Sequence, residues 1–224
     1  MEKSLSIIIP VHNEQESIKR LHKELQDTIK NLDYNTEMIF INDGSTDDTQ
    51  KTLNELAAEN HNTKIIQLAR NYGQTAAIAA GIKNSSGKIL ITIDADLQNN
   101  PRDIPKLLEQ IELGYDVVSG WRKDRKDPLV SRQLPSKIAN WLISFLTGVK
   151  LHDYGCTLKA YRREFLENFA IYGEMHRLLP AYCAWQGAKL TEVVVSHRQR
   201  LYGKSKYGLS RIFKVILDLF VLKF

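Results

Sequence analysis

The sequence has few cysteines and no long apolar run, and each absence excludes a class of protein. Its 224 residues contain only two cysteines, Cys156 and Cys183. A small secreted fold held together by several disulfide bonds is therefore excluded. No apolar stretch reaches the ~18 residues that a membrane-spanning helix needs. The N-terminus also lacks the pattern of a signal peptide, so we expect this part of the protein to face the cytosol.

Two nucleotide-binding signatures and a zinc signature are missing as well. No G-x-G-x-x-G follows the first apolar stretch, and no G-x-x-x-x-G-K-[ST] occurs anywhere. These absences count against a dinucleotide cofactor and against a P-loop. The histidines lie at positions 12, 22, 61, 152, 176 and 197. Their spacing is not that of metal ligands, which argues against a zinc site.

The composition is that of a folded chain with a modest positive charge. Hydrophobic residues make up 43% of the sequence and charged residues 25%, and the formal net charge is +5. This balance supports a sizeable core and excludes wholesale disorder. We expect one domain over residues 1–208, followed by an appendage over residues 209–224 that is mostly apolar after position 212.

Strand and helix patterns alternate four times in the first hundred residues. Apolar runs rich in β-branched residues lie at 5–10, 38–41, 64–69 and 88–93, and each is followed by a polar turn and a helical pattern. Further strands are expected at 115–120 and 189–195, and an amphipathic helix at 136–146. The alternation predicts an α/β fold with a mostly parallel central sheet and helices on both faces.

The fourth of these strands leads directly into Asp94, Asp96 and Gln98. If the chain stays extended here, the three side chains point the same way. Two neighbouring carboxylates and an amide oxygen favour a hard divalent cation, Mg²⁺ or Mn²⁺, which completes its coordination with water and substrate phosphates. The alternative is a simple turn in which an aspartate caps the helix after Pro101.

Four polar clusters follow the four strands, at residues 10–14, 42–48, 70–73 and 94–98. In a parallel sheet all of them lie at the carboxyl edge, where such folds bind their ligands. The resulting pocket would combine groups for a base and ribose, one arginine and a metal-binding carboxylate pair. A nucleoside diphosphate compound requires this combination.

The second half of the chain carries two charged segments. Residues 121–128 form a charged loop, for which solvation at the surface is the alternative interpretation. Residues 197–208 gather cations around two glycines and are interpreted as a flexible flap over phosphates. The apolar segment after residue 212 is either a buried terminal helix or a helix in the membrane interface, where upstream basic residues would meet anionic lipid.

Taken together, these motifs resemble those of family-two glycosyltransferases. Within that family the chain resembles the polyisoprenyl-phosphate branch, which includes dolichol-phosphate mannose synthase and bacterial undecaprenyl-phosphate glucosyltransferases. The resemblance covers nearly all of the chain. It rests on IIPVHNE at 8–14, NDGS at 42–45, ARNYG at 69–73, DADLQ at 94–98 and RLYGKSK at 200–206.

The resemblance implies a role for particular residues. The nucleotide sugar would be bound by Pro10, Val11, Asn13, Glu14, Asp43, Arg70, Gly73, Asp94 and Ala95. The Mg²⁺ or Mn²⁺ ion would be held by Asp94, Asp96 and Gln98. The acceptor phosphate would be bound by Arg122, Arg132, Arg200, Ser205 and Lys206. The catalytic set would be Asp96, Arg122, Arg132, Arg200 and Lys206.

The resemblance also implies a Rossmann-like nucleotide-sugar transferase fold of the GT-A type and a reaction. One hexose would pass, with inversion, from a UDP- or GDP-hexose to undecaprenyl or dolichyl phosphate, for cell-envelope glycan or glycoconjugate synthesis. Residues 1–208 would be the catalytic domain and 209–224 a membrane-associating helix. The protein would work at the cytoplasmic face of the cell membrane, without nucleic acid; a homo-oligomer or a membrane partner subunit is left open.

Two departures and three alternatives accompany this interpretation. Relatives often have Tyr where this chain has His12 and Asp where it has Asn42, and many continue into two transmembrane helices. A transferase acting on a sugar hydroxyl would use Glu174 as its base. A nucleotidyltransferase would use the same carboxylate pair. A non-catalytic module would bind nucleic acid through the basic flap, although the flap lacks the interleaved aromatics of a stacking platform.

Overall fold

The structure is a computed structural model, and it describes residues 3–124, 134–167 and 171–202. Several predictions fall outside this range. They are the phosphate-binding roles of Arg132, Ser205 and Lys206, and the helix over residues 209–224. Within the described residues, no helix has both the length and the apolar character needed to cross a membrane.

A seven-stranded sheet forms the centre of the molecule, in the order β3-β2-β1-β4-β6-β5-β7. All neighbouring strands pair in parallel except at β6, which is antiparallel to both β4 and β5. The predicted α/β fold with a mostly parallel sheet is confirmed. The strands are β1 (Ser4–Val11), β2 (Asn35–Asn42), β3 (Thr63–Gln67), β4 (Ile89–Thr92), β5 (Val117–Trp121), β6 (Lys159–Arg162) and β7 (Leu190–Val194).

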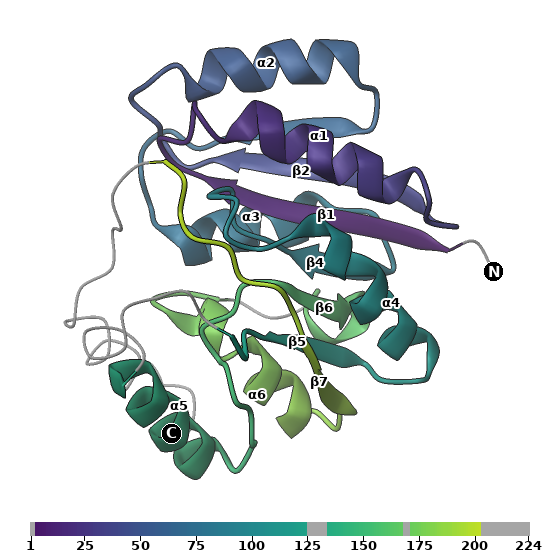
Figure 1. Cartoon of the computed structure of the whole chain (residues 1–224), viewed down its shortest axis with the longest axis vertical. Coiled ribbons are helices and arrows are strands. Elements are labelled where there is room, and N and C mark those ends of the chain that lie inside the picture. Colours follow the sequence, from purple (N-terminus) through teal and green to yellow (C-terminus); the bar gives the residue numbers. More distant parts are fainter. Residues whose placement is uncertain (1–2, 125–133, 168–170, 203–224) are drawn as a thin grey trace.

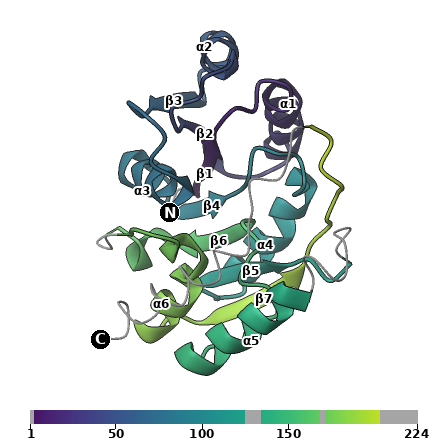
Figure 2. The ribbon, with the colours of Figure 1, turned by 90° about the vertical axis from the view of Figure 1, so that its left-hand side faces the viewer.

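Helices cover both faces of this sheet (Figure 1, Figure 2). The helices are α1 (Ile18–Ile29), α2 (Thr49–Glu59), α3 (Gln74–Asn84), α4 (Ile104–Glu112), α5 (Leu134–Thr147) and α6 (Leu179–Trp185). Short 3₁₀ turns lie at η1 (Pro101–Asp103), η3 (Arg163–Phe165) and η4 (Met175–Arg177). Figure 2 shows α1 and α4 on one side of the sheet and α3 and α6 on the other.

The alternation of side chains along β1 explains how one strand serves both layers. Ile7 and Ile9 pack with α1, α2 and α4, whereas Ile8 packs with α3 and α6. All three isoleucines are fully buried, as expected for a parallel strand covered on both faces. Close contact fixes α3 as well, since a Cβ on Gly81 would lie 2.5 Å from Ile8 Cγ2.

After β7 the chain crosses back over the sheet edge, and we call this segment, residues 195–200, the strap. The Ser196 N–H donates to Asp103 Oδ2 at 2.7 Å, and Arg198 N–H donates to the Gln98 carbonyl at 2.9 Å. The Arg198 guanidinium then reaches Glu24 on α1 at 2.6 Å. The strap therefore links the last strand to the first helix, across the carboxyl ends of the strands between them (Figure 1).

Candidate active site

A cavity of about 260 Å³ lies at the carboxyl edge of the sheet, where β1, β2 and β4 end. Its walls come from all four predicted polar clusters and from the strap, so the expected convergence of these clusters is observed. The lining residues are Pro10, Val11, His12, Glu14, Asp43, Asn71, Gly73, Gln74, Asp94, Ala95, Asp96 and Arg200.

The loop after β1 is fixed to the loop after β2 by Asn13. Asn13 has a positive φ of 54°, a backbone conformation that asparagine tolerates better than most residues. Its N–H donates to Ser45 Oγ at 2.9 Å, and its Oδ1 accepts from the Thr46 N–H at 2.8 Å. Asn13 therefore joins the two loops through its N–H and its side-chain amide oxygen, without lining the cavity.

Asp43 fixes the loop after β3, which forms another wall of the cavity, through side-chain hydrogen bonds. Its two carboxylate oxygens accept from the N–H groups of Tyr72, at 2.7 Å, and Gly73, at 2.9 Å. The neighbouring Gly44 has φ of 63°, and a Cβ there would lie 2.4 Å from the Arg70 carbonyl carbon. Only glycine fits this turn. Arg70 itself is exposed, with its guanidinium 5.0 Å from the centroid of the Tyr72 ring, and does not line the cavity.

Two carboxylates face the cavity from the turn after β4. Gln74 Nε2 donates to Asp94 Oδ1 at 2.7 Å. The guanidinium of Arg200, brought in by the strap, pairs with Asp96 Oδ2 and lies 3.7 Å from Glu14 Oε1. Burial, together with the charge of Asp94, raises the pKa of the Asp96 carboxyl to about 7, against the opposing effect of Arg200.

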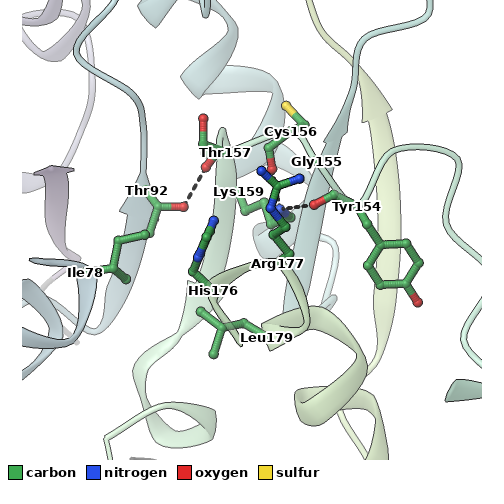
Figure 3. Close-up of a pocket in the computed structure, with 10 residues that line it drawn as sticks. All are labelled: Ile78, Thr92, Tyr154, Gly155, Cys156, Thr157, Lys159, His176, Arg177 and Leu179. Carbon is green, nitrogen blue, oxygen red and sulfur yellow. Dashed lines mark hydrogen bonds between the residues drawn. The ribbon is translucent and has the colours of Figure 1, made fainter. Parts of the chain in front are cut away.

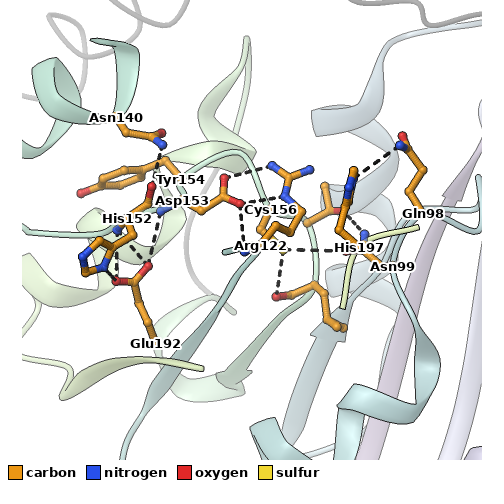
Figure 4. Close-up of polar contacts among 12 residues, drawn as sticks. Gln98, Asn99, Arg122, Asn140, His152, Asp153, Tyr154, Cys156, Glu192 and His197 are labelled. Carbon is orange, nitrogen blue, oxygen red and sulfur yellow. Dashed lines mark hydrogen bonds and ion pairs between the residues drawn. The ribbon is translucent and has the colours of Figure 1, made fainter. Parts of the chain in front are cut away.

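The backbone at this turn differs from the extended chain that the sequence suggested. Strand β4 ends at Thr92, and Leu97 has a positive φ of 63° while its side chain is fully buried. A left-handed leucine breaks the alternation of side chains. Gln98 consequently contacts the strap, with Nε2 3.4 Å from His197 Nε2 and 3.5 Å from the Arg198 carbonyl oxygen (Figure 4).

These positions bear directly on a metal ion. Asp94 and Asp96 share the cavity, whereas Gln98 does not line it, and the role of Gln98 as a ligand stays a prediction. Across the described ranges no three His, Cys, Asp or Glu side chains group as a ready-made metal site. A carboxylate pair is nevertheless a donor set that suits Mg²⁺ or Mn²⁺ when substrate phosphates complete the shell.

Arg122, expected at the acceptor phosphate, forms a largely buried ion pair with Asp153 at the end of β5. Its Nε and Nη2 donate to the two carboxylate oxygens of Asp153 at 2.7 and 2.9 Å (Figure 4). Burial alone would lower the pKa of Arg122, but the Asp153 charge outweighs burial and raises it. Arg122 does not line the 260 Å³ cavity. Its role toward a phosphate stays a prediction.

A second group of buried polar side chains lies between β4, β6 and η4 (Figure 3). It surrounds a cavity of about 10 Å³, the volume that one water molecule requires. Lys159 is 3% exposed and donates to the carbonyl of Tyr154 at 3.1 Å and to that of Cys156. Burial lowers the pKa of Lys159 to about 8, against the opposing charge of Asp153. Sequence reasoning missed this group, because a lone Lys gives no periodic signal.

The residue before η4 bears on the alternative with a sugar hydroxyl as acceptor. Glu174 Oε2 lies 3.6 Å from Arg177 Nε. Neither residue lines the larger cavity, and Arg177 contributes to the small one instead. A Cβ on Gly155 would lie 3.2 Å from Arg122 Nη2 and 3.7 Å from Arg177 Nη1. The two guanidinium groups therefore approach one point beside the end of β5.

Most of the predicted nucleotide-sugar residues do line the cavity. The exceptions are Asn13 and Arg70. Three lining residues were missed as binding residues: His12, Asn71 and Gln74. His12 Nδ1 lies 2.9 Å from the Asp43 carbonyl oxygen. The signal for all three was their place inside, or directly after, the same polar clusters.

Comparison with protein families and curated proteins gives consistent matches. The family described as Glycosyl transferase family 2 matches residues 6–169. A dodecaprenyl-phosphate galacturonate synthase of Rhizobium johnstonii is 43% identical, over 98% of this chain and 66% of that protein. An undecaprenyl-phosphate 4-deoxy-4-formamido-L-arabinose transferase of Pseudomonas fluorescens is 42% identical, over 96% of this chain and 63% of that protein. The chain thus spans slightly less than two thirds of the length of these relatives.

Solved structures show the same fold at lower identity. Glucosyl-3-phosphoglycerate synthase from Mycobacterium tuberculosis, in complex with Mn²⁺, UDP and phosphoglyceric acid, superposes with a TM-score of 0.72. The identity is 18%, over 99% of this chain and 78% of that one. The same synthase with Mn²⁺ and UDP-glucose also gives 0.72, at 20% identity, over 98% of this chain and 78% of that one. The predicted glycosyltransferase fold of the GT-A type is thereby confirmed.

Proposed function

The chain belongs to glycosyl transferase family 2, and from this premise we propose that it transfers one sugar from a nucleoside diphosphate sugar to a polyprenyl phosphate. The observation that carries the proposal is the shared cavity of Asp94, Asp96 and Arg200. Acidic and basic groups meet there beside loops that suit a nucleoside. The lipid acceptor is supported by relatives at 42–43% identity whose names specify dodecaprenyl or undecaprenyl phosphate.

In this proposal Asp94 and Asp96 would hold Mg²⁺ or Mn²⁺ at the donor diphosphate. The carboxylate pair fits a cation, because burial and mutual repulsion raise the pKa of Asp96 to about 7, and a cation between the two groups relieves that repulsion. When bound, a divalent metal supplies Lewis-acid stabilisation of the nucleoside diphosphate as its charge grows.

The remaining cavity residues position the donor. Pro10 and Val11, which line the cavity at the end of β1, would contact the nucleoside. Asp43 accepts hydrogen bonds from the N–H groups of Tyr72 and Gly73 and so fixes the loop after β3 beside the cavity. Arg200 places its positive charge 3.7 Å from Glu14. When the donor binds, Arg200 would leave Asp96 and pair with a phosphate oxygen, which stabilises the leaving diphosphate. A base of UDP or GDP type is consistent with this arrangement.

The acceptor requires positioning more than deprotonation. A phosphate monoester has a second pKa of about 6, so at neutral pH its oxygen is already a nucleophile. It attacks the anomeric carbon from the side opposite the leaving diphosphate, which inverts the configuration. We place the reaction at the cytoplasmic face of the membrane.

A transfer assay tests this proposal. The full chain is incubated with undecaprenyl phosphate and, in turn, UDP-, GDP- and dTDP-sugars, with Mn²⁺ or with EDTA. One donor should give a lipid-linked sugar together with free nucleoside diphosphate, and EDTA should stop the reaction. Release of pyrophosphate, or transfer to a sugar hydroxyl with no lipid product, would overturn the proposal and favour a nucleotidyltransferase or a hydroxyl-directed enzyme.

A further inference from the structure

Two guanidinium groups flank a gap beside Gly155, in the loop that leads into β6. A Cβ on Gly155 would lie 3.2 Å from Arg122 Nη2, 3.5 Å from Asp153 Oδ1 and 3.7 Å from Arg177 Nη1. Gly155 does not have a positive φ, so the backbone conformation itself does not require glycine. The absent side chain instead leaves room for a ligand atom between the two cations. We call this space the Gly155 cradle.

The cradle is largely buried but not closed. Gly155 is partly exposed, and the side chains of Arg122 and Arg177 are 13% and 24% exposed. Figure 3 shows the Arg177 guanidinium next to the loop from Gly155 to Thr157. Little water screens a guanidinium in such a place, so it attracts an anion more strongly than a surface arginine does.

The charges around the cradle do not balance. Burial lowers the pKa of Lys159 to about 8, and the charges of Arg122 and Arg177 add to this effect while Asp153 opposes it. The three cations therefore interact with one another. The carboxylates paired with them are Asp153, at Arg122, and Glu174, at Arg177. Among these five side chains one positive charge is in excess, and a single carboxylate on a ligand would neutralise it.

The strand order places the cradle where the sugar of the donor would lie. The base, ribose, diphosphate and sugar of a nucleoside diphosphate sugar follow one another in a line. In the proposed function the nucleoside lies at the ends of β1 and β2, and the diphosphate lies at Asp94 and Asp96 after β4. The next strands in the sheet are β6 and β5, and neighbouring strands lie about 4.8 Å apart. Because β6 is antiparallel, its beginning lies at the same edge as the ends of β4 and β5.

The lining residues show that the cradle adjoins the larger cavity. The small cavity of about 10 Å³ is lined by Gly155 and Arg177 of the cradle and by Thr92 at the end of β4. Asp94, two residues after Thr92, lines the larger cavity. The helix α3 also contributes residues to both walls. The two spaces are therefore neighbours along β4 and α3.

We propose that Arg177, together with Arg122 across Gly155, forms a subsite for the carboxylate of an acidic sugar, so that the donor is a nucleoside diphosphate uronic acid. A guanidinium suits a carboxylate, because it can form two parallel N–H···O bonds with it. A neutral hydroxymethyl group would leave the excess charge of the cradle uncompensated. The inference rests on the proposed function for the place of the diphosphate. It concerns donor binding alone, so it is testable without a lipid acceptor and without turnover.

Donor binding tests the subsite. The full chain with Mn²⁺ is titrated by calorimetry with pairs of donors that differ only at C6 of the sugar. The pairs are UDP-glucuronate with UDP-glucose, UDP-galacturonate with UDP-galactose, and GDP-mannuronate with GDP-mannose. One acidic donor should bind about tenfold more tightly than its neutral counterpart, the effect of one charge-assisted contact. If no acidic donor is preferred in any pair, the proposal is overturned.

Variants of the cradle assign the preference to its residues. Arg177→Gln should remove the preference by weakening the acidic donor about tenfold, with unchanged affinity for the nucleoside diphosphate alone. Gly155→Ala keeps every charge but fills the cradle, and it should weaken the acidic donor more than the neutral one. The matched control is Arg102→Gln, an exposed arginine that lines neither cavity, which should bind both donors like the unchanged chain. Equal weakening of acidic and neutral donors in both cradle variants would contradict the subsite.

The transfer assay separates this inference from the proposed function. Tight binding of an acidic donor without a lipid-linked product would contradict the lipid acceptor and leave the subsite supported. A lipid-linked neutral sugar, with no product from any acidic donor, would do the reverse. If Arg177→Gln leaves donor binding unchanged and raises the KM for undecaprenyl phosphate, the cradle holds the acceptor phosphate and the proposed subsite is wrong.

Discussion

The two halves of the sheet use their carboxyl edges in opposite ways. In the half formed by β3, β2, β1 and β4, the strand ends surround an open cavity of about 260 Å³. In the half formed by β6, β5 and β7, Arg122 is already paired with Asp153, and the cavity beside β6, between β4 and η4, has a volume of only about 10 Å³. The first half is built to receive a ligand, and the second to hold its own charges in place.

The two halves also differ in the sign of the buried charge. The open half concentrates carboxylates, and the pKa of Asp96 is raised to about 7 by burial and by Asp94. The closed half holds the largely buried Arg122 and the buried Lys159, and burial lowers the pKa of Lys159 to about 8. A cation is therefore favoured at β4 and an anion near the end of β5. The following variants break or sharpen this contrast.

The largest effect is expected in the open half, for Asp96→Asn. Turnover should fall about 1000-fold, because a neutral amide neither binds the metal as a carboxylate does nor pairs with Arg200. Asp48→Asn, an exposed carboxylate at the N-terminus of α2 with no side-chain cap hydrogen bond, is the matched control. Near-normal activity of Asp96→Asn in the transfer assay, with an unchanged circular dichroism spectrum, would contradict the role of Asp96 as a metal ligand.

In the closed half, Asp153→Asn should act first on stability. It leaves the Arg122 guanidinium buried without its bidentate partner, at a cost of about 3 kcal/mol. The free energy of unfolding from urea titration measures this loss, with Asp124→Asn, an exposed carboxylate after the same strand, as control. If stability is unchanged and only the KM for the lipid acceptor rises, Asp153 serves the ligand directly and the two halves are less different than they look.

Glu37 on β2 offers a pH-dependent test of the open half away from its cavity. Burial alone would raise the pKa of Glu37, but its hydrogen-bond donors, chiefly Lys64 at 2.5 Å, lower it to about 2. A lowered pKa stabilises the fold above pH ~4.5, and this contribution is lost as the pH falls toward 2. The free energy of unfolding of the wild type should exceed that of Glu37→Gln by about 2–3 kcal/mol at pH 7 and by about half as much near pH 3. A difference that does not change with pH would show that Glu37 acts through packing alone.

The smallest effect is expected where the strap joins the two halves. Arg200→Ala should lower kcat/KM about tenfold, because the leaving diphosphate loses one charge-assisted hydrogen bond. Sugar preference among donors should not change. Arg198→Ala, which removes the pair with Glu24 but leaves the cavity lining intact, separates strap anchoring from phosphate binding. A changed donor preference in Arg200→Ala would mean that the strap contacts the sugar of the donor and selects it.

Sequence reasoning succeeded where local pattern determined the structure. The β-branched runs of β1, β2 and β4 and the polar cluster after each needed no tertiary information. It missed β6, because Lys159–Arg162 is short and its reversed direction depends on pairing with both β4 and β5. It expected the Gln98 side chain to point the same way as Asp94 and Asp96, whereas Leu97 is left-handed and Gln98 Nε2 lies 3.4 Å from His197 Nε2. The role of Gln98 as a metal ligand stays a prediction.

The strap also makes the site depend on residues that are distant in the sequence. Asp96 and Arg200, which pair in the cavity, are 104 positions apart. The strap that carries Arg200 is held by the Arg198 pair with Glu24 on α1. A substitution of Glu24, which lies outside the cavity, should therefore disturb the carboxylate pair by releasing the strap.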